Sequence, residues 1–161
     1  MKESFPVKLF FLAVIIMMPG LALAAGSGNI AVSATVLSKN QCKFNTAAAT
    51  LNFGNLDPSN PIDVTASATF VFKCVGSDDP ATFAMIDDDG LYETGLDANR
   101  MRHATIGAAY LPYTLSLNPT SGTAPRNVNQ NLTVTGTVTG ANYQTAFAGS
   151  YTDTVVISIN P

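Results

Sequence analysis

The sequence predicts an all-β domain, and three observations support this fold class. Several segments alternate apolar and polar residues with a period of two, which is typical of half-buried strands. Polar stretches that contain Gly or Pro separate these segments and have the composition of turns and loops. After residue 24, no segment shows the 3.6-residue periodicity of an amphipathic helix. Short strands joined by turns indicate a β-sandwich.

Residues 1–24 have the pattern of a removable signal peptide. Lys2 and Lys8 supply the charged start, and Leu9–Met18 forms an apolar run that is too short to span a bilayer. Ala22-Leu23-Ala24 matches a small-x-small cleavage site. We therefore expect export without a membrane span, and a mature chain of one domain that begins at Ala25.

The charge of the mature chain argues against two classes of partner. After residue 24 the chain holds six basic and ten acidic residues, a net charge of −4. A mildly acidic surface with few scattered cations does not suit nucleic acid or an anionic membrane.

The segment Gly28–Leu37 lies directly after the expected cleavage site and before the first cysteine. Four of its side chains share one face of an extended chain, and small or polar residues occupy most of the other; the four are Ile30, Val32, Ala34 and Val36. This pattern is typical of a strand. The strand either belongs to the chain's own sheet or is a free arm that completes a neighbouring copy.

Two cysteines in an exported chain most simply form one disulfide, Cys42–Cys74. Their spacing fits neither a CxxC redox pair nor a zinc site. Closing a loop of about 30 residues should stabilise the fold by roughly 3–4 kcal/mol.

The strands of the domain follow in order. Thr50–Gly54 is expected to be a short strand, and Ile62–Cys74 is the clearest strand of the chain, with Asp63–Lys73 supplying its polar face. Its expected inner face consists of Ile62, Val64, Ala66, Ala68, Phe70, Phe72 and Cys74. The later predicted strands are Ala81–Ile86, Ala109–Leu117, Leu132–Thr139 and Tyr151–Asn160, and the last has Val155, Ile157 and Ile159 on its inner side.

Loops are expected between these strands at Asn55–Pro61, Asp87–Arg100 and Asn118–Asn131. Pro112 places the strand Ala109–Leu117 at an edge or a bulge, because proline cannot donate to a ladder.

Few residues are candidates for chemistry. Asp87-Asp88-Asp89 precedes Gly90 and could bind calcium, but it lacks the EF-hand spacing and suits an ordinary turn. His103 is the only histidine, which argues against a copper or zinc enzyme, and we expect it on the surface or at a loop edge. Three arginines are expected to be surface cations paired with nearby acids: Arg100, Arg102 and Arg126. We expect no catalytic, metal or cofactor site.

Several of these pieces, in this order, resemble the spore coat protein U family, which includes subunits of archaic chaperone–usher pili. The strongest is the C-terminal stretch Gly149-Ser-Tyr-Thr-Asp-Thr-Val-Val-Ile-Ser-Ile, which is similar to the closing Gly-x-Tyr-x-Asp strand of that family. Four further pieces support the resemblance: the arm before Cys42, the segment Thr50–Gly54, Cys74 at the end of a long strand, and the Arg100 stretch leading into Tyr113-Thr114-Leu115. The resemblance extends from Gly28 to Pro161.

The resemblance implies an immunoglobulin-like sandwich, residues 38–161, that lacks its last strand and has a groove beside its final one. Donor-strand insertion by an arm, residues 25–37, would fill that groove in the next subunit. The inserted side chains would be Ile30, Val32, Ala34 and Val36, and the receiving edge would be Val155, Ile157 and Ile159. A periplasmic chaperone and an outer-membrane usher are the implied assembly partners.

The sequence thus predicts a non-enzymatic structural subunit, exported through the periplasm to a surface fimbria that serves adhesion or biofilm formation. Its partners would be other copies or related subunits. The alternative is a self-contained secreted coat protein that folds its own N-terminal strand.

Overall fold

The computed structural model describes residues 30–36 and 39–161, so the expected signal peptide and the remainder of the arm lie outside the described residues. The chain divides into two units, residues 1–35 and 36–161, and each is described by itself. In the second unit all sheets are antiparallel, and the only helix described is the single turn α1 (Gly140–Tyr143). The all-β prediction is confirmed.

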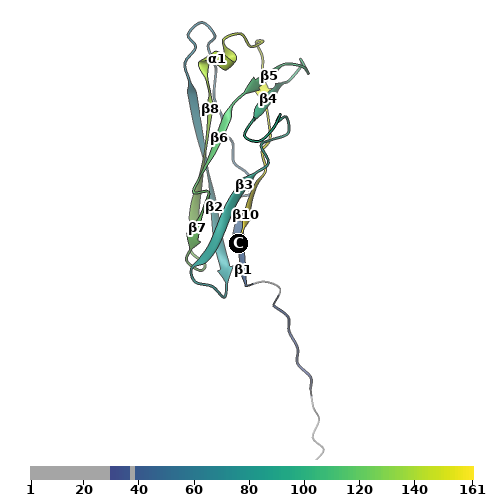
Figure 1. The fold of residues 1–161 in the computed structure, drawn as a ribbon, viewed down its shortest axis with the longest axis vertical. Helices are drawn as coiled ribbons and strands as arrows, with labels where there is room; N and C mark the ends of the chain where they lie inside the picture. The colour runs from purple at the N-terminus through teal and green to yellow at the C-terminus, as the bar shows by residue number, and fades with distance from the viewer. Residues whose placement is uncertain (1–29, 37–38) are drawn as a thin grey trace, which may run out of the picture. The chain divides into compact units, whose positions relative to one another are not determined.

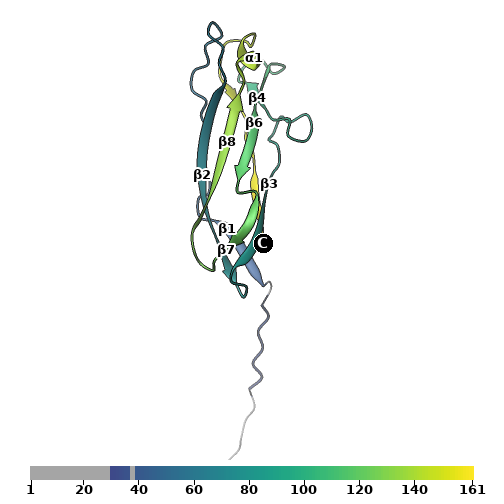
Figure 2. The ribbon, with the colours of Figure 1, turned by 60° about the vertical axis from the view of Figure 1, so that its left-hand side comes forward.

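The largest sheet has the strand order β1-β2-β8-β6 (Figures 1 and 2). The burial of its two longest strands follows the predicted alternation. Its strands are β1 (Asn40–Phe44), β2 (Val64–Gly76), β8 (Gln130–Val138) and β6 (Thr114–Asn118). The inner face of β8 is buried, whereas hydroxyl side chains line the outer face of the β2–β8 pair, where Thr65 and Thr137 lie 3.2 Å apart. Threonine and serine hydroxyls therefore coat the outer face of this strand pair.

Two smaller sheets have three strands each. One has the order β10-β3-β7, from β10 (Ile157–Asn160), β3 (Ala81–Asp87) and β7 (Ser121–Ala124). The other has the order β5-β4-β9, from β5 (Tyr110–Pro112), β4 (Arg100–His103) and β9 (Tyr151–Thr152). The sequence predicted a loop at 118–131, but β7 lies within it, so the prediction was wrong for Ser121–Ala124. Only one of its four residues is buried, so its sequence shows little alternation.

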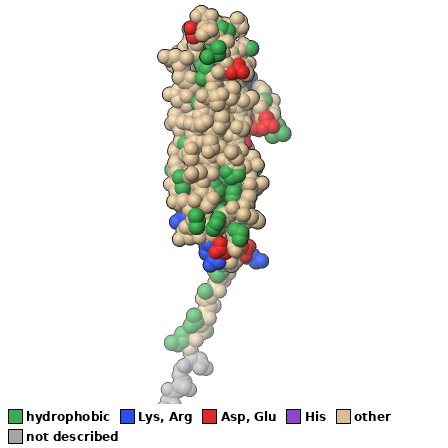
Figure 3. All heavy atoms as spheres, turned by 90° about the vertical axis from the view of Figure 1, so that its left-hand side faces the viewer, with side chains coloured by type: hydrophobic (Ala, Val, Ile, Leu, Met, Phe, Trp, Pro, Cys, Tyr) green, Lys and Arg blue, Asp and Glu red, His purple; other side chains and the backbone are tan. Residues whose placement is uncertain are grey.

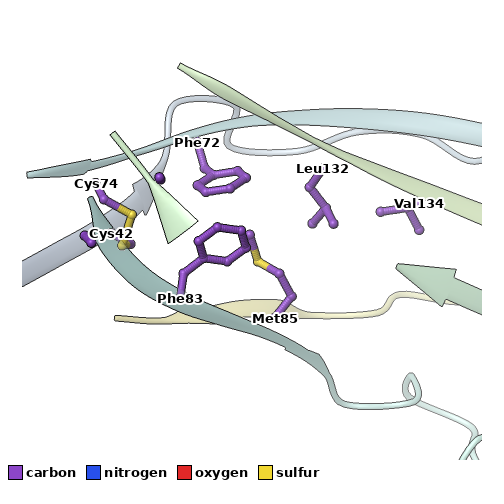
Figure 4. Packing of buried hydrophobic residues seen from close by; sticks show 9 residues of the cluster. Cys42, Phe72, Cys74, Phe83, Met85, Leu132 and Val134 are labelled. Carbon is purple, nitrogen blue, oxygen red and sulfur yellow. A yellow bond between two sulfur atoms is a disulfide. The ribbon is translucent and has the colours of Figure 1, made fainter. Parts of the chain in front are cut away.

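The core lies between the β2–β8 face and β3 (Figure 4). Phe72 of β2 and Phe83 of β3 meet edge to face, with ring centroids 4.9 Å apart, and Leu132 and Met85 extend the contact. At one end of this core the predicted disulfide joins Cys42 to Cys74, which are directly opposite in the β1–β2 register. The disulfide indicates an oxidising compartment.

Two predicted strands are each divided in the structure. Ala109–Leu117 becomes β5 and β6, and the chain passes at Tyr113 from the sheet that contains β4 to the sheet that contains β8. Pro112 ends β5, which is an edge strand, as expected for a proline. Tyr151–Asn160 becomes β9 and β10, separated by residues 153–156.

Two other predictions were wrong in detail. Thr50–Gly54 is not a strand, although Leu51 and Phe53 are both half-buried. Gly136 of β8 makes room for both, because a Cβ there would collide with Leu51 Cδ2 and lie 2.9 Å from Phe53 Cζ. Ile62, predicted on the inner face of the strand, precedes β2 and is 60% exposed. Its backbone N–H donates to the hydroxyl of Tyr143, and its C=O accepts from the same hydroxyl.

Among the described residues, no helix has the length and apolarity needed to cross a membrane.

Candidate functional site

An open groove of about 690 Å³ runs between two segments that are distant in the sequence. One wall is the segment after β1, residues 44–53, and the other is residues 151–157. The floor between them is mainly apolar and consists of Ala68, Phe70, Met101, Tyr113, Leu115 and Val134.

The floor coincides with the junction of two hydrophobic clusters. One cluster centres on Phe72 and Leu132 and the other on Leu111 and Val138, and Leu115 packs against both. The large side chains that line the groove, such as Phe70 and Leu115, are only partly buried. An apolar surface of this kind, concave and uncovered, is typical of a place where another apolar group binds.

The backbone of the first wall has unused hydrogen-bonding groups. Residues 47–51 are assigned to no strand, and within the described part of the chain their backbone groups take part in no hydrogen bond. The wall is anchored just before this stretch, where Asn45 N–H donates to Val71 C=O (2.7 Å) and Val71 N–H donates to Thr46 Oγ1 (3.3 Å).

The second wall is bonded on its far side only. Thr154 C=O accepts from Leu91 N–H and Val156 C=O accepts from Asp88 N–H, each at 3.2 Å. Val155 lies between them, and among the described residues its N–H and C=O make no hydrogen bond. Because backbone groups alternate in direction along an extended chain, those of Val155 point to the groove side. β10 continues this wall; among the described strands it is hydrogen-bonded to β3 alone, and it lies near β1 without pairing with it.

The Gly-x-Tyr-x-Asp stretch holds this second wall in place. Gly149 has φ +146° and a Cβ there would collide with the ring of His103, so the position requires glycine. Tyr151 packs edge to face on the same ring, with centroids 4.9 Å apart. Asp153 accepts from the hydroxyl of Tyr113 (2.8 Å) and from Leu91 N–H (3.0 Å). Each motif residue therefore fixes the last part of the chain to a different neighbour.

His103 is buried, with 5% of its surface exposed, so the prediction of a surface or loop-edge histidine was wrong. Its Nδ1 accepts the backbone N–H groups of Thr105 and Ile106 at 3.1 and 3.0 Å. Nε2 therefore carries the proton and donates to Ala148 C=O at 3.1 Å. The neutral ring ties the segment before Tyr151 to β4. A single histidine in the sequence gave no pattern from which this role could be predicted.

Burial, and then the hydrogen bond to Asp153, raise the pKa of Tyr113 well above its usual value of 10. Tyr113 is thus a neutral donor throughout the physiological range. Burial, and then the neighbouring charge of Asp89, raise the pKa of Asp87 at the end of β3.

A second hollow of about 440 Å³ continues the groove. The two hollows share Leu51, Phe53, Met101 and Tyr151, and the second extends to Leu56, Pro58 and Phe147. The groove therefore runs past the Gly-x-Tyr-x-Asp stretch toward the loop that precedes β2.

The predicted receiving edge is placed as follows. Val155 and Ile157 line the groove, whereas Ile159 packs against the core cluster beyond it. On the predicted arm, Ile30, Val32 and Val36 are 89%, 90% and 87% exposed, Ala34 is exposed as well, and residues 30–36 are assigned to no strand. The roles of these two sets of residues, as donor strand and as acceptor edge, stay a prediction.

The acidic turn has a structural contact to the groove wall. Asp88 Oδ1 accepts the N–H groups of Gly90 (3.1 Å) and Val156 (2.8 Å). In the described part of the chain, no group of three or more His, Cys, Asp or Glu side chains is arranged to hold a metal ion.

The three arginines differ from one another. Arg126 pairs with Asp79 at 3.8 Å, as predicted. Arg100 and Arg102 instead lie over the rings of Tyr110 and Tyr92, at 3.9 and 4.7 Å from the centroids. Cation–π contacts therefore replace the expected pairing with acids for these two residues.

The fold and the groove define an all-β, disulfide-bonded domain with an uncovered apolar groove whose two walls have unpaired backbone groups. The chain belongs to the spore coat protein U domain family, whose sequence profile matches residues 27–158. The resemblance found in the sequence is confirmed. Proteins of this pilin-like family are typically non-catalytic structural proteins.

No curated protein sequence matches the chain. Among solved structures, the chain is similar to one from a chaperone–tip adhesin complex described as vital for synergistic activation of CFA/I fimbriae biogenesis. The TM-score is 0.47 and the identity 14%, and the alignment covers 76% of this chain and 41% of that one. The chain thus spans about two fifths of the length of that relative.

Proposed function

We propose that this protein is a structural subunit of a surface fibre that assembles by strand donation. In this proposal, residues 38–161 form an immunoglobulin-like sandwich that lacks one strand, and the arm of another copy, residues 25–37, supplies it. The observation that carries the proposal is the groove, because its apolar floor lies between two walls with unpaired backbone groups. An extended chain inserted there would cover the apolar floor and pair with the backbone groups of the walls at the same time.

The dimensions of arm and groove agree. The second wall, residues 151–157, covers six residue steps, and Ile30 to Val36 also covers six. At about 3.3 Å per step both lengths are about 20 Å. Side chains two residues apart then enter the groove at intervals of about 6.6 Å, and the residues between them face away.

The chemistry of the arm also suits this role. Ile30, Val32 and Val36 are almost fully exposed, and each large aliphatic side chain moved from water into an apolar site contributes about 1.5–3 kcal/mol. Each new main-chain hydrogen bond adds about 0.5–1.5 kcal/mol net. Ordering the arm opposes these gains, so several side chains must insert together for stable binding.

Chain length favours donation to another copy over insertion into the same domain. Val36 is four residue steps from Asn40, at most about 14 Å. A hairpin within one chain would therefore place Val36 beside Asn40 and Ile30 beside Thr46. β1 already lies against β10, which leaves no room for a strand between them at Asn40–Phe44. Ala34 and Val36 would then lie outside the groove.

The test compares the chain 25–161 with a chain that lacks residues 25–37, by size-exclusion chromatography with light scattering. The intact chain should form a ladder of multimers, and the truncated chain should stay small and bind a synthetic arm peptide. Val32→Asp should prevent multimers, whereas Ser33→Asp, on the opposite face of the arm, should permit them. A stable monomeric intact chain that unfolds on truncation would instead favour the self-contained coat protein.

The remaining parts of the proposal follow from assembly. A groove left open exposes apolar surface and an unpaired edge, so a periplasmic chaperone would hold the subunit before it reaches an outer-membrane usher. The expected signal peptide and the disulfide support export. Adhesion or biofilm formation would be the purpose of the assembled fibre.

A further inference from the structure

The cations of the domain are concentrated at one end. Of the six basic residues after residue 24, four lie around the start of β1, the end of β2 and the loop before β8, where two carboxylates accompany them. We call this group the basic end; it comprises Lys39, Lys43, Lys73, Arg126, Asp78 and Asp79. Blue and red side chains gather together there in Figure 3. The rest of the mature chain has eight carboxylates and only two cations.

The basic end has four cations and two carboxylates, so half of its positive charge is not compensated. Lys43 and Lys73 are directly opposite each other in the β1–β2 register, an arrangement that like charges disfavour. Lys73 Nζ donates to the neutral amide of Asn127 at 3.2 Å. In the described part of the chain, Arg126–Asp79 is the single ion pair. The three lysines are therefore available to an acidic partner.

The opposite end of the domain is acidic. Asp63 lies directly before β2 and Asp57 lies in the preceding loop, and both are exposed. Hydrogen bonds from Ser59 lower the pKa of Asp57 and keep it ionised. The thirteen residues of β2 separate the two ends by about 40 Å. We call Asp57 and Asp63 the acidic end.

Each end lies close to one of the two parts that take part in the proposed strand exchange, the groove or the root of the arm. Asp57 lies between Leu56 and Pro58, which line the second hollow, so the groove opens at the acidic end. Lys39 is three residues after Val36, so the root of the arm is attached at the basic end. An arm that enters the groove with its root at the second hollow therefore brings the basic end of its own domain to the acidic end of the receiving domain.

We propose that the basic end of the donating copy docks on the acidic end of the receiving copy. The inference rests on the proposed strand donation and adds a second contact to it. An arm inserted in the reverse direction would bring two basic ends together, which is repulsive. The charges therefore select the insertion in which the arm runs antiparallel to residues 151–157.

The expected signature is a rate effect that depends on salt. Exposed ion pairs contribute little affinity, but complementary charges speed association and are screened beyond about 8 Å at physiological ionic strength. Growth of multimers should therefore be fast at low salt and slower at high salt.

The test measures multimer growth of the chain 25–161 by light scattering, at about 20 mM and about 500 mM salt, where screening differs strongly. Lys43→Glu should slow growth about tenfold at low salt, within the range of electrostatic steering. Asp57→Lys should slow it similarly, and the chain with both substitutions should recover most of the rate. The matched control is Thr69→Glu with Ser116→Glu, which makes the same change in net charge on the middle of the same sheet and should have little effect.

Two further readouts separate the possible failures. Lys43→Glu replaces a like-charged pair with an opposite pair, so its thermal unfolding temperature should not fall, and slower growth would then not reflect unfolding. An uncharged peptide of residues 25–38, in excess, should stop growth equally in all variants. The docking proposal is overturned, and strand donation stands, if the peptide stops multimer growth but charge reversal does not change the growth rate. The same conclusion follows if the chain with both substitutions does not recover the growth rate. If the peptide has no effect and no multimers form, both proposals fail.

Discussion

Replacing Tyr113 by phenylalanine tests whether the groove wall is held by a side-chain hydrogen bond. Tyr113 lies where the chain passes from β5 to β6, and its hydroxyl donates to Asp153 Oδ2 at 2.8 Å. The substitution removes this bond and keeps the ring, which packs against Phe53 with centroids 6.0 Å apart.

The expected loss of stability is about 1–2 kcal/mol. A hydrogen bond to a charged group contributes about 1.5–3 kcal/mol. The lower end applies because Asp153 is only half-buried and its Oδ1 still accepts from Leu91 and Thr154. For a domain of this size the melting temperature should fall by about 3–8 °C. Binding of the arm peptide should weaken as well, because Asp153 lies on the groove wall.

The pH dependence distinguishes the hydrogen bond from packing. Folding raises the pKa of Tyr113 above its unfolded value of about 10, so this residue contributes stability that is full below pH 10. That contribution is lost as pH rises above 10, since the unfolded chain ionises first. The difference in unfolding free energy between the wild type and Tyr113→Phe should therefore shrink between pH 9 and pH 11.

Urea unfolding at several pH values measures this difference. Tyr110→Phe is the matched control, because no hydrogen bond of the Tyr110 hydroxyl is found among the described residues, and its stability should change by less than about 0.5 kcal/mol. Equal stability of the wild type and Tyr113→Phe at pH 7 would refute the reasoning, as would a difference that stays constant at alkaline pH.

Two further predictions concern the scaffold. Replacing Cys42 and Cys74 together by alanine should lower the unfolding free energy by about 3–4 kcal/mol relative to the oxidised wild type. Urea unfolding of both proteins under oxidising and reducing conditions measures this difference. If the variant were less stable than the wild type by the same amount under both conditions, the disulfide would not be the cause. Gly149→Ala should destabilise by more than about 2 kcal/mol, because of its positive φ and the collision with His103, whereas Gly107→Ala has open space and should be nearly neutral in the same thermal assay.

The alternation of the sequence was sufficient to predict the core strands. Phe72 and Cys74 are buried where the period of two placed them, because a strand with one buried face must alternate. Export and the position of Cys74 at the end of the inner face of β2 similarly predicted the disulfide.

The same alternation was less informative about pairing. Thr50–Gly54 alternates but is no strand, and residues 151–160 form two strands in different sheets. β7 hardly alternates and is a strand. A period of two indicates which face of an extended chain contacts apolar surface, and it does not indicate whether a neighbouring backbone is present to pair with.

By itself, therefore, the sequence determined the fold class, the core faces, the disulfide and the family. Only the tertiary structure decided that residues 47–51 and Val155 face a common groove without backbone partners, that His103 is buried, and that Lys39, Lys73 and Arg126 share one end. These features depend on residues far apart in the chain, and local periodicity contains no information about which distant segments meet, because side-chain alternation is set within each strand.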